Sequence, residues 1–221
     1  MNAEDELPDP DLKIILLGDS ACGKSKLVER YLMDEYNPRQ MSTYALTLFR
    51  KEVKTADGDV LTIDFWDTAG QETFSKMHPS YYYRAHCCIM VFDVTRKVTY
   101  QHLNDWYAEF REYCQDVPCI LVANKVDVDY NVTKKEFKFA SRNNLPFFFV
   151  SAADGTNVVK VFQNAVAEAK RFKDAGGDTM GEIMKMIGGD SSSDRAKESK
   201  VNDESKLGDR KFYEGDMKES K

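Results

Sequence analysis

In the stretch Gly18-Asp19-Ser20-Ala21-Cys22-Gly23-Lys24-Ser25, two glycines enclose four residues, and a lysine and a serine follow. An apolar run precedes this stretch, and apolar residues at helical spacing follow it. The glycines let the backbone curl so that successive N–H groups point at one anion. The following helix adds its N-terminal dipole, Lys24 adds a positive charge, and the Ser25 hydroxyl can bind Mg²⁺. The stretch, here called the phosphate loop, therefore predicts polyphosphate binding between a strand and a helix.

The periodicity of the rest of the chain predicts an α/β domain. Strands and helices alternate, which favours a mostly parallel sheet, and an Asp57-Gly58 turn makes one edge antiparallel. Ligands of such sheets bind beyond the carboxyl ends of the strands. Thr133 and Glu136 fit a capping box that would open a helix. The expected strands are residues 12–17, 46–54, 60–66, 87–94, 118–123 and 147–150, and the expected helices include residues 99–113 and 157–172.

Composition indicates a single domain with a charged tail. The 221 residues, of which 42% are hydrophobic, can build one sizeable core. We expect a disordered acidic segment at residues 1–11, a domain at 12–173 and a largely disordered charged tail at 174–221. The net charge of −6 argues against nucleic-acid binding. The sequence shows no secretory signal, membrane-spanning run or myristoylation pattern.

The five cysteines are odd in number, and we expect reduced thiols in an intracellular protein. The spacing of cysteines and histidines does not fit a zinc site. Cys22 lies at a helix N-terminus beside Lys24, which could lower its pKa, although bound phosphate would oppose this. We interpret His78, His86 and His102 as isolated surface or packing residues.

A second motif, Asn124-Lys125-Val126-Asp127, follows an expected strand. The Asp127 carboxylate can accept hydrogen bonds from N1–H and the exocyclic amine of guanine, a donor pair that adenine lacks. Asn124 can tie base and loop together, and the Lys125 stem can lie on the ring. Ser151-Ala152-Ala153 can offer a backbone N–H to the guanine carbonyl. Together with the phosphate loop, this motif predicts GTP rather than ATP as the bound nucleotide.

Polar residues expected near the outer phosphate predict hydrolysis and switching. Asp67 ends a strand and can hold Mg²⁺ together with Ser25 and Thr43. The Gly70 N–H can contact a γ-phosphate, and Gln71 can orient the attacking water. Loss of the γ-phosphate would release both loops, which makes a switch. The sequence positions no arginine to act in cis, so intrinsic turnover should be slow, on the order of 10⁻⁴–10⁻² s⁻¹.

With these motifs the chain resembles Ras-superfamily small GTPases over residues 12–173. Residues 18–20 and 66–72 resemble the Rab branch. Its Rab-like protein 2 subfamily is similar to this chain in residues 42–48, 65–67, 88–94, 96–100 and 150–160. The resemblance implies a P-loop small GTPase fold with a six-stranded sheet and helices on both faces, and binding of GTP/GDP with Mg²⁺. It also implies that Tyr36 lies against the guanine. It further implies a role in intraflagellar transport, in the cytoplasm, at the basal body and in the cilium or flagellum.

Several positions depart from the Rab pattern. The last cysteine is Cys119, so no prenyl anchor is expected, and residues 44–48 replace the usual Rab segment. Thr73 stands where an arginine is usual and Arg84 where a glycine is usual, so we do not assume ordinary Rab partners. We expect a monomer whose switch regions bind intraflagellar transport B complex proteins and ciliary-base proteins when GTP is bound.

Two functions stay open at this point. One is a switch that hydrolyses GTP, and the other is a docking module that nucleotide merely stabilises and whose hydrolysis is incidental. Gln71 favours the switch. Equal capture of partners with GDP and with a non-hydrolysable GTP analogue would favour the docking module.

Overall fold

The computed structural model describes residues 9–33, 46–55, 58–68, 79–177 and 217–219. Its main sheet has six strands in the order β2-β3-β1-β4-β5-β7. In this sheet β2 and β3 run antiparallel, and the other neighbouring strands are parallel. This confirms the predicted α/β sheet with one antiparallel edge. The strands are β1 (Leu12–Leu17), β2 (Leu46–Lys54), β3 (Val60–Thr68), β4 (Cys87–Asp93), β5 (Cys119–Asn124) and β7 (Phe147–Phe149).

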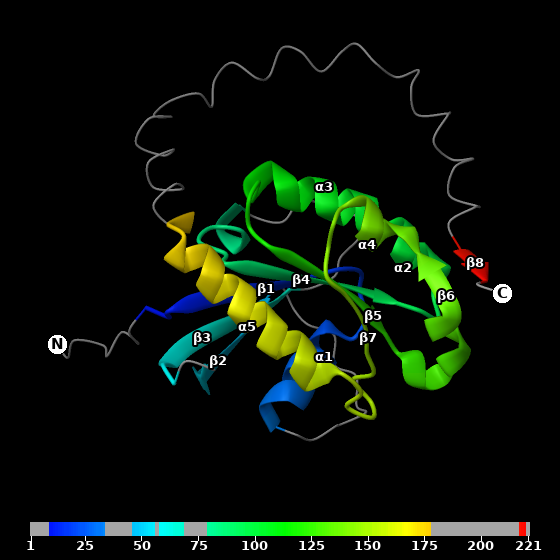
Figure 1. The fold of residues 1–221 in the computed structure, drawn as a ribbon, viewed down its shortest axis with the longest axis horizontal. Coiled ribbons are helices and arrows are strands. Elements are labelled where there is room, and N and C mark those ends of the chain that lie inside the picture. Colours follow the sequence, from blue (N-terminus) through cyan, green and yellow to red (C-terminus); the bar gives the residue numbers. More distant parts are fainter. Residues whose placement is uncertain (1–8, 34–45, 56–57, 69–78, 178–216, 220–221) are drawn as a thin grey trace, which may run out of the picture.

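Helices cover both faces of the sheet (Figure 1). Helices α1 and α5 pack on one face, where Ile14 and Phe65 are buried. Helices α2, α3 and α4 lie on the other face, which buries Phe92 and Trp106. Because both faces are covered, β1, β4 and β5 are buried along their whole length. The helices are α1 (Lys24–Met33), α2 (Lys97–Gln101), α3 (Leu103–Tyr113), α4 (Lys138–Arg142) and α5 (Val158–Asp174).

The segment expected to form one helix over residues 99–113 is divided. Helix α2 ends just before His102, and α3 begins just after it. The backbone of His102 stays helical, with φ −71° and ψ −9°, so the two helices follow each other without a loop. Apolar spacing does not register such a break, because the buried face continues across it.

The capping box expected at Thr133 is wrong. The Thr133 hydroxyl donates a hydrogen bond to Tyr130 O (2.8 Å) within the 3₁₀ helix η3 (Tyr130–Lys134). The chain then extends as β6 (Lys135–Phe137), which pairs antiparallel with β8 (Met217–Glu219). Phe137 is buried against Phe92, and this packing favours the extended backbone over an earlier helix start. Two further 3₁₀ helices are η1 (Pro79–Tyr81) and η2 (Val126–Val128).

The sheet brings the predicted motifs together at the carboxyl ends of its parallel strands. The phosphate loop follows β1, Asp67 lies at the end of β3, Asn124 ends β5, and Ser151 follows β7 closely. Open α/β sheets bind their ligands at these carboxyl ends. All five cysteines lie in the described part of the chain, and they are buried free thiols. Within the described ranges, no helix combines the length and apolar character of a membrane span.

Candidate nucleotide-binding site

The phosphate loop lies against the ends of β4 and β5. Gly18 has φ +133° and Gly23 has φ +93°, a region that residues with side chains rarely adopt. A Cβ on Gly18 would lie well within 3.0 Å of the Val91 carbonyl oxygen, and one on Gly23 within 3.0 Å of the Asn124 side-chain nitrogen. Both positions therefore require glycine for conformation and for space. The result is a curled backbone of the kind that binds a polyphosphate.

Lys24 and Ser25 begin α1 beside the loop. Lys24 is buried, and its Nζ donates hydrogen bonds to Gly18 O (2.7 Å) and Asp19 O (3.0 Å), so the ammonium spans the loop. The Ser25 hydroxyl donates a hydrogen bond to Asp67 Oδ2 in β3. A hydroxyl beside a carboxylate is a pair of hard oxygen donors, the ligands that Mg²⁺ prefers. The residues present therefore fit the expected metal.

Asn124 joins the phosphate loop to the expected guanine site. Its Nδ2 donates to Cys22 O (2.8 Å), and its Oδ1 accepts from Ala152 N (3.2 Å). Ser151 Oγ donates to Asp127 Oδ1 (2.6 Å) and so orients that exposed carboxylate. Three segments that are far apart in the sequence thus meet through residues of the predicted motifs. Their nucleotide-binding roles stay predictions.

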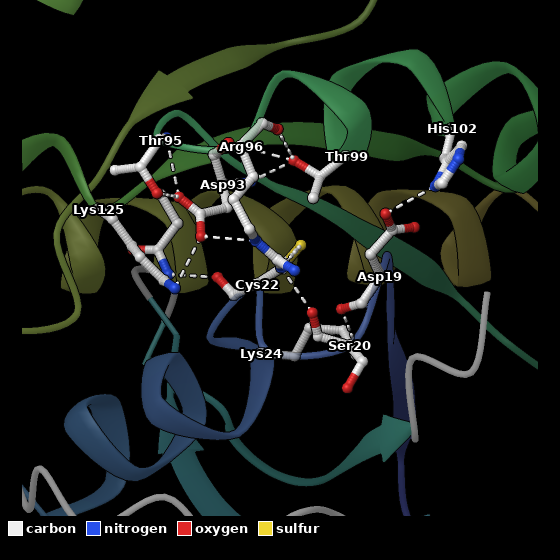
Figure 2. A network of polar contacts seen from close by, with 11 residues as sticks. Asp19, Ser20, Cys22, Lys24, Asp93, Thr95, Arg96, Thr99, His102 and Lys125 are labelled. Atoms are coloured by element: carbon white, nitrogen blue, oxygen red, sulfur yellow. Dashed lines mark hydrogen bonds and ion pairs between the residues drawn. The ribbon is translucent and has the colours of Figure 1, made fainter.

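Asp93, at the end of β4, is the centre of a polar network that the sequence motifs did not include (Figure 2). Its buried carboxylate pairs with Lys125 Nζ (2.7 Å) and Arg96 Nε (3.1 Å) and accepts hydrogen bonds from Thr95. Burial would raise the pKa of Asp93, but the hydrogen bonds from Lys125 and Thr95 outweigh it and lower the pKa. Arg96 also donates to Ser20 O (2.6 Å) in the phosphate loop. The position of Arg96 after a buried strand was visible in the sequence, but the loop it contacts was not.

Asp19 ties the phosphate loop to α3. It is buried, its Oδ1 accepts a hydrogen bond from Trp106 Nε1 (2.8 Å), and its Oδ2 lies 2.8 Å from His102 Nδ1. His102 is therefore not isolated, although it is a packing residue as expected. Its contact with Asp19 spans 83 positions, which local sequence spacing does not show. His86 is a buried packing residue, as expected, and its Nδ1 accepts from Lys13 N (2.8 Å).

Cys22 lies inside the phosphate loop and is fully buried. Burial raises the pKa of its thiol and outweighs the opposite effect of the Lys24 and Arg96 charges. The lowering of this pKa that Lys24 could cause is therefore outweighed. The sequence showed the neighbouring cation but not the loss of solvent, which is the larger effect.

The remaining predicted residues differ in how much the structure says of them. Ser20 and Ala21 are exposed on the phosphate loop, and Ala21 has φ +58°. The Ala153 carbonyl accepts a hydrogen bond from Arg30 Nη2 (3.3 Å). Four predicted site residues lie outside the described residues: Tyr36, Thr43, Gly70 and Gln71.

The fold and the clustered motifs define a nucleotide-binding protein of the P-loop class. A model of the Ras family matches residues 13–171, and the chain belongs to that family. Rab-like protein 2A of Homo sapiens is 58% identical over 179 residues, which cover 81% of this chain and 78% of the human protein. Rab-like protein 2A of Mus musculus is 58% identical over 177 residues, covering 80% and 79%. Ras-related protein RABG3f of Arabidopsis thaliana is 37% identical over 169 residues, covering 72% and 82%.

Membership of the family carries an activity with it. Ras-family proteins of the Rab type bind GTP and GDP and hydrolyse GTP, and this chain matches them over most of its length. The chain is accordingly a Rab-like GTP hydrolase and a nucleotide-dependent switch.

Proposed function

We propose that this GTPase uses Mg²⁺, hydrolyses GTP slowly, and acts at the ciliary base, where its GTP form binds components of the intraflagellar transport B complex. The contact between the Ser25 hydroxyl and the Asp67 carboxylate carries the proposal of the metal. Ser25 and Asp67 would hold Mg²⁺, which would supply positive charge to stabilise the negative charge of the outer phosphates. The place of action, in the cytoplasm and the cilium or flagellum, is proposed from the resemblance to the Rab-like protein 2 subfamily.

An apolar surface beside the metal pair supports a protein partner. Leu48 on β2 is 50% exposed and pairs across the sheet with Trp66 on β3. The Trp66 ring meets the edge of Tyr81 in η1, with 6.3 Å between ring centres. Trp66 directly precedes Asp67, so this Leu48 patch (Leu48, Trp66 and Tyr81) shares β3 with one member of the metal pair. An amphipathic helix or a coiled coil is the kind of partner that suits such a surface.

Hydrolysis is tested by Gln71→Leu. We expect the variant to bind GTP normally and to hydrolyse it at least roughly tenfold more slowly, a loss of about 1.4 kcal/mol in transition-state stabilisation. The measurement is single-turnover hydrolysis by the full chain, with Mg²⁺ and with a chelator. An equal rate of wild-type hydrolysis with Mg²⁺ and with the chelator would contradict the proposed use of Mg²⁺. Equal rates for wild type and Gln71→Leu would contradict the role of Gln71.

The partner is tested by calorimetry between the full chain and purified subunits of the transport complex. We expect binding with a non-hydrolysable GTP analogue and much weaker binding with GDP. Leu48→Asp should abolish the binding, whereas Val60→Asp should not. Val60 is 61% exposed on the same hairpin but lies at the other end of β3, which makes it a matched control. Equal binding in both nucleotide states would favour the docking module, and absence of binding would contradict the ciliary role.

A further inference from the structure

Arg96 bridges two parts of the nucleotide site. It lies between β4 and α2, and its side chain is 36% exposed. Its Nε contacts Asp93 Oδ2 (3.1 Å), and its Nη2 donates to Ser20 O (2.6 Å) and Cys22 Sγ (3.6 Å) in the phosphate loop. Figure 2 shows the guanidinium between the strand end and the loop. One planar group thus links a buried carboxylate to the exposed tip of the loop.

Asp93 anchors one end of this link. The oxygen that contacts Arg96 also pairs with Lys125 Nζ (2.7 Å) of the guanine motif. The other oxygen accepts hydrogen bonds from Thr95 N (2.9 Å) and Thr95 Oγ1 (2.7 Å). Both oxygens of the carboxylate are therefore occupied, and the side chain is almost completely buried. Arg96 therefore holds the loop from a fixed position, because the same Asp93 oxygen also binds Lys125 of the guanine motif.

The hydrogen bond to Ser20 O acts on the part of the loop that would face an anion. In a trans peptide the C=O and the following N–H point in opposite directions. The Arg96 guanidinium holds the Ser20 carbonyl toward itself and so directs the Ala21 N–H away from itself. The orientation of this peptide is set by ψ of Ser20 and φ of Ala21, and Ala21 has φ +58°, a value that residues with a side chain seldom adopt. A charge-assisted bond to one carbonyl therefore selects the backbone shape that presents its donors.

We propose that Arg96 is a positioning residue that keeps the phosphate loop in its binding shape and thereby slows the release of GDP and GTP. The proposal rests on the nucleotide binding described above. A loop that is already shaped loses less conformational entropy on binding, and most differences in affinity among variants of one site appear in the dissociation rate. Arg96 acts through the backbone of Ser20 rather than through the reacting phosphate. Its loss should therefore accelerate nucleotide release much more than it changes the rate of the hydrolysis step.

The experiment measures release of radiolabelled GDP from the full chain after addition of excess unlabelled GDP. Arg96→Met should release GDP roughly tenfold faster than wild type, the loss expected for one charge-assisted hydrogen bond. Arg96→Lys keeps the charge without the fork and should fall between the two. Arg111→Met is the matched control, since Arg111 Nη1 also donates to three carbonyls, those of Cys114, Gln115 and Val117, away from the site. Its release rate should equal that of wild type.

Two further measurements separate positioning from general loosening. The preference for GDP over inosine diphosphate should be unchanged in Arg96→Met, because the guanine motif is intact. It should fall in Asp93→Asn, which also weakens the pair with Lys125. Unchanged GDP release in Arg96→Met would overturn the proposal, as would slower single-turnover hydrolysis with normal release, which would place Arg96 at the reacting phosphate. A wild-type chain that retains no GDP would contradict the nucleotide-binding activity itself, and the proposal with it.

Discussion

At Gly18 the chain passes so close to β4 that no side chain fits between the loop and the Val91 carbonyl oxygen. Gly58, in the turn between β2 and β3, has a similar left-handed backbone with φ +92°, yet no atom lies within 4 Å of the place its Cβ would take. Comparison of the two positions therefore separates the two costs of adding a side chain, which are backbone strain and steric overlap. At Gly58 the cost is backbone strain alone, and at Gly18 it is strain together with steric overlap.

Alanine substitutions at these glycines should differ clearly in their effect on stability. Gly58→Ala should lower the free energy of unfolding by about 1 kcal/mol, the cost of a strained backbone. Gly18→Ala should lower it by roughly 3–5 kcal/mol and abolish GDP binding, because either the loop or β4 must move. Urea denaturation of both variants, with a GDP titration, measures this. Equal losses of stability would show that the close approach to Val91 has no energetic consequence.

The residues of the site divide into those that the sequence predicted and those that it could not. The phosphate loop, Asn124 and Ser151 were predictable because phosphate and guanine each require fixed residue types at fixed spacings. Arg96 and Trp106 belong to no such pattern. Arg96 reaches Ser20 and Trp106 reaches Asp19, across 76 and 87 positions of the sequence. Only the packing of α2 and α3 against the sheet brings them to the loop.

Among the elements, β1 combines complete burial with one lysine. Lys13 Nζ donates to Tyr83 O (2.9 Å) and Ser80 O (3.2 Å) and lies 3.4 Å from the centre of the Trp66 ring. Burial lowers the pKa of Lys13 to about 8, although the nearby Cys114 and Asp64 act in the opposite direction. The folded protein therefore holds this proton less tightly than the unfolded chain does.

This difference predicts a pH dependence of stability. Between about pH 8 and pH 10.5 the unfolded chain binds more protons at Lys13 than the folded protein does, so this residue's contribution to the free energy of unfolding rises with pH. Lys13→Met should remove the rise. Urea denaturation of both proteins at pH 7, 8.5 and 10 tests it, because effects of the cysteines and tyrosines largely cancel in the difference. A difference that stays constant with pH would contradict the lowered pKa.

The elements also show where periodicity and local patterns are insufficient. Strands β1, β4 and β5 were predictable because burial on both faces leaves continuous apolar runs. The residues around Thr133 were not, since a pattern typical of a helix start was overridden by packing of Phe137 against Phe92. Arg84 has φ +54°, a conformation in which glycine is at ease, and this agrees with the glycine that is usual there in Rabs. The Arg84 side chain lies on the surface, where its Nη1 is 3.8 Å from the exposed Asp9 carboxylate.

For the molecule as a whole, the site is distributed over strand ends, so ligand binding and global stability are linked. The loop after β1, the end of β3, the end of β5 and the turn after β7 each contribute one part. No part lies in a position to bind nucleotide by itself. Unfolding of the sheet therefore separates the donors, and nucleotide at 100 times its Kd should stabilise the fold by about 2.7 kcal/mol.

Asp127→Asn should change which nucleotide gives this stabilisation. The wild-type Tm should rise with GDP and not with xanthosine diphosphate, and the order should be reversed in the variant, because the carboxylate that accepts the guanine donors is lost. Asp129→Asn is the control, since its amide oxygen can still accept from Asn131 N as the carboxylate does. Thermal unfolding with each nucleotide measures the shifts. A variant that still responds to GDP alone would place guanine recognition elsewhere.

Because every thiol of this protein is buried, a cysteine introduced on the surface can be labelled selectively. All five cysteines are buried, and burial raises the pKa of Cys22, so maleimide and iodoacetamide reagents should react slowly with the native protein. One cysteine introduced at an exposed position such as Val60 would then carry a dye or a spin label with little labelling of the native cysteines. The slow rate at which Cys22 is alkylated would meanwhile report how often the loop around it opens spontaneously.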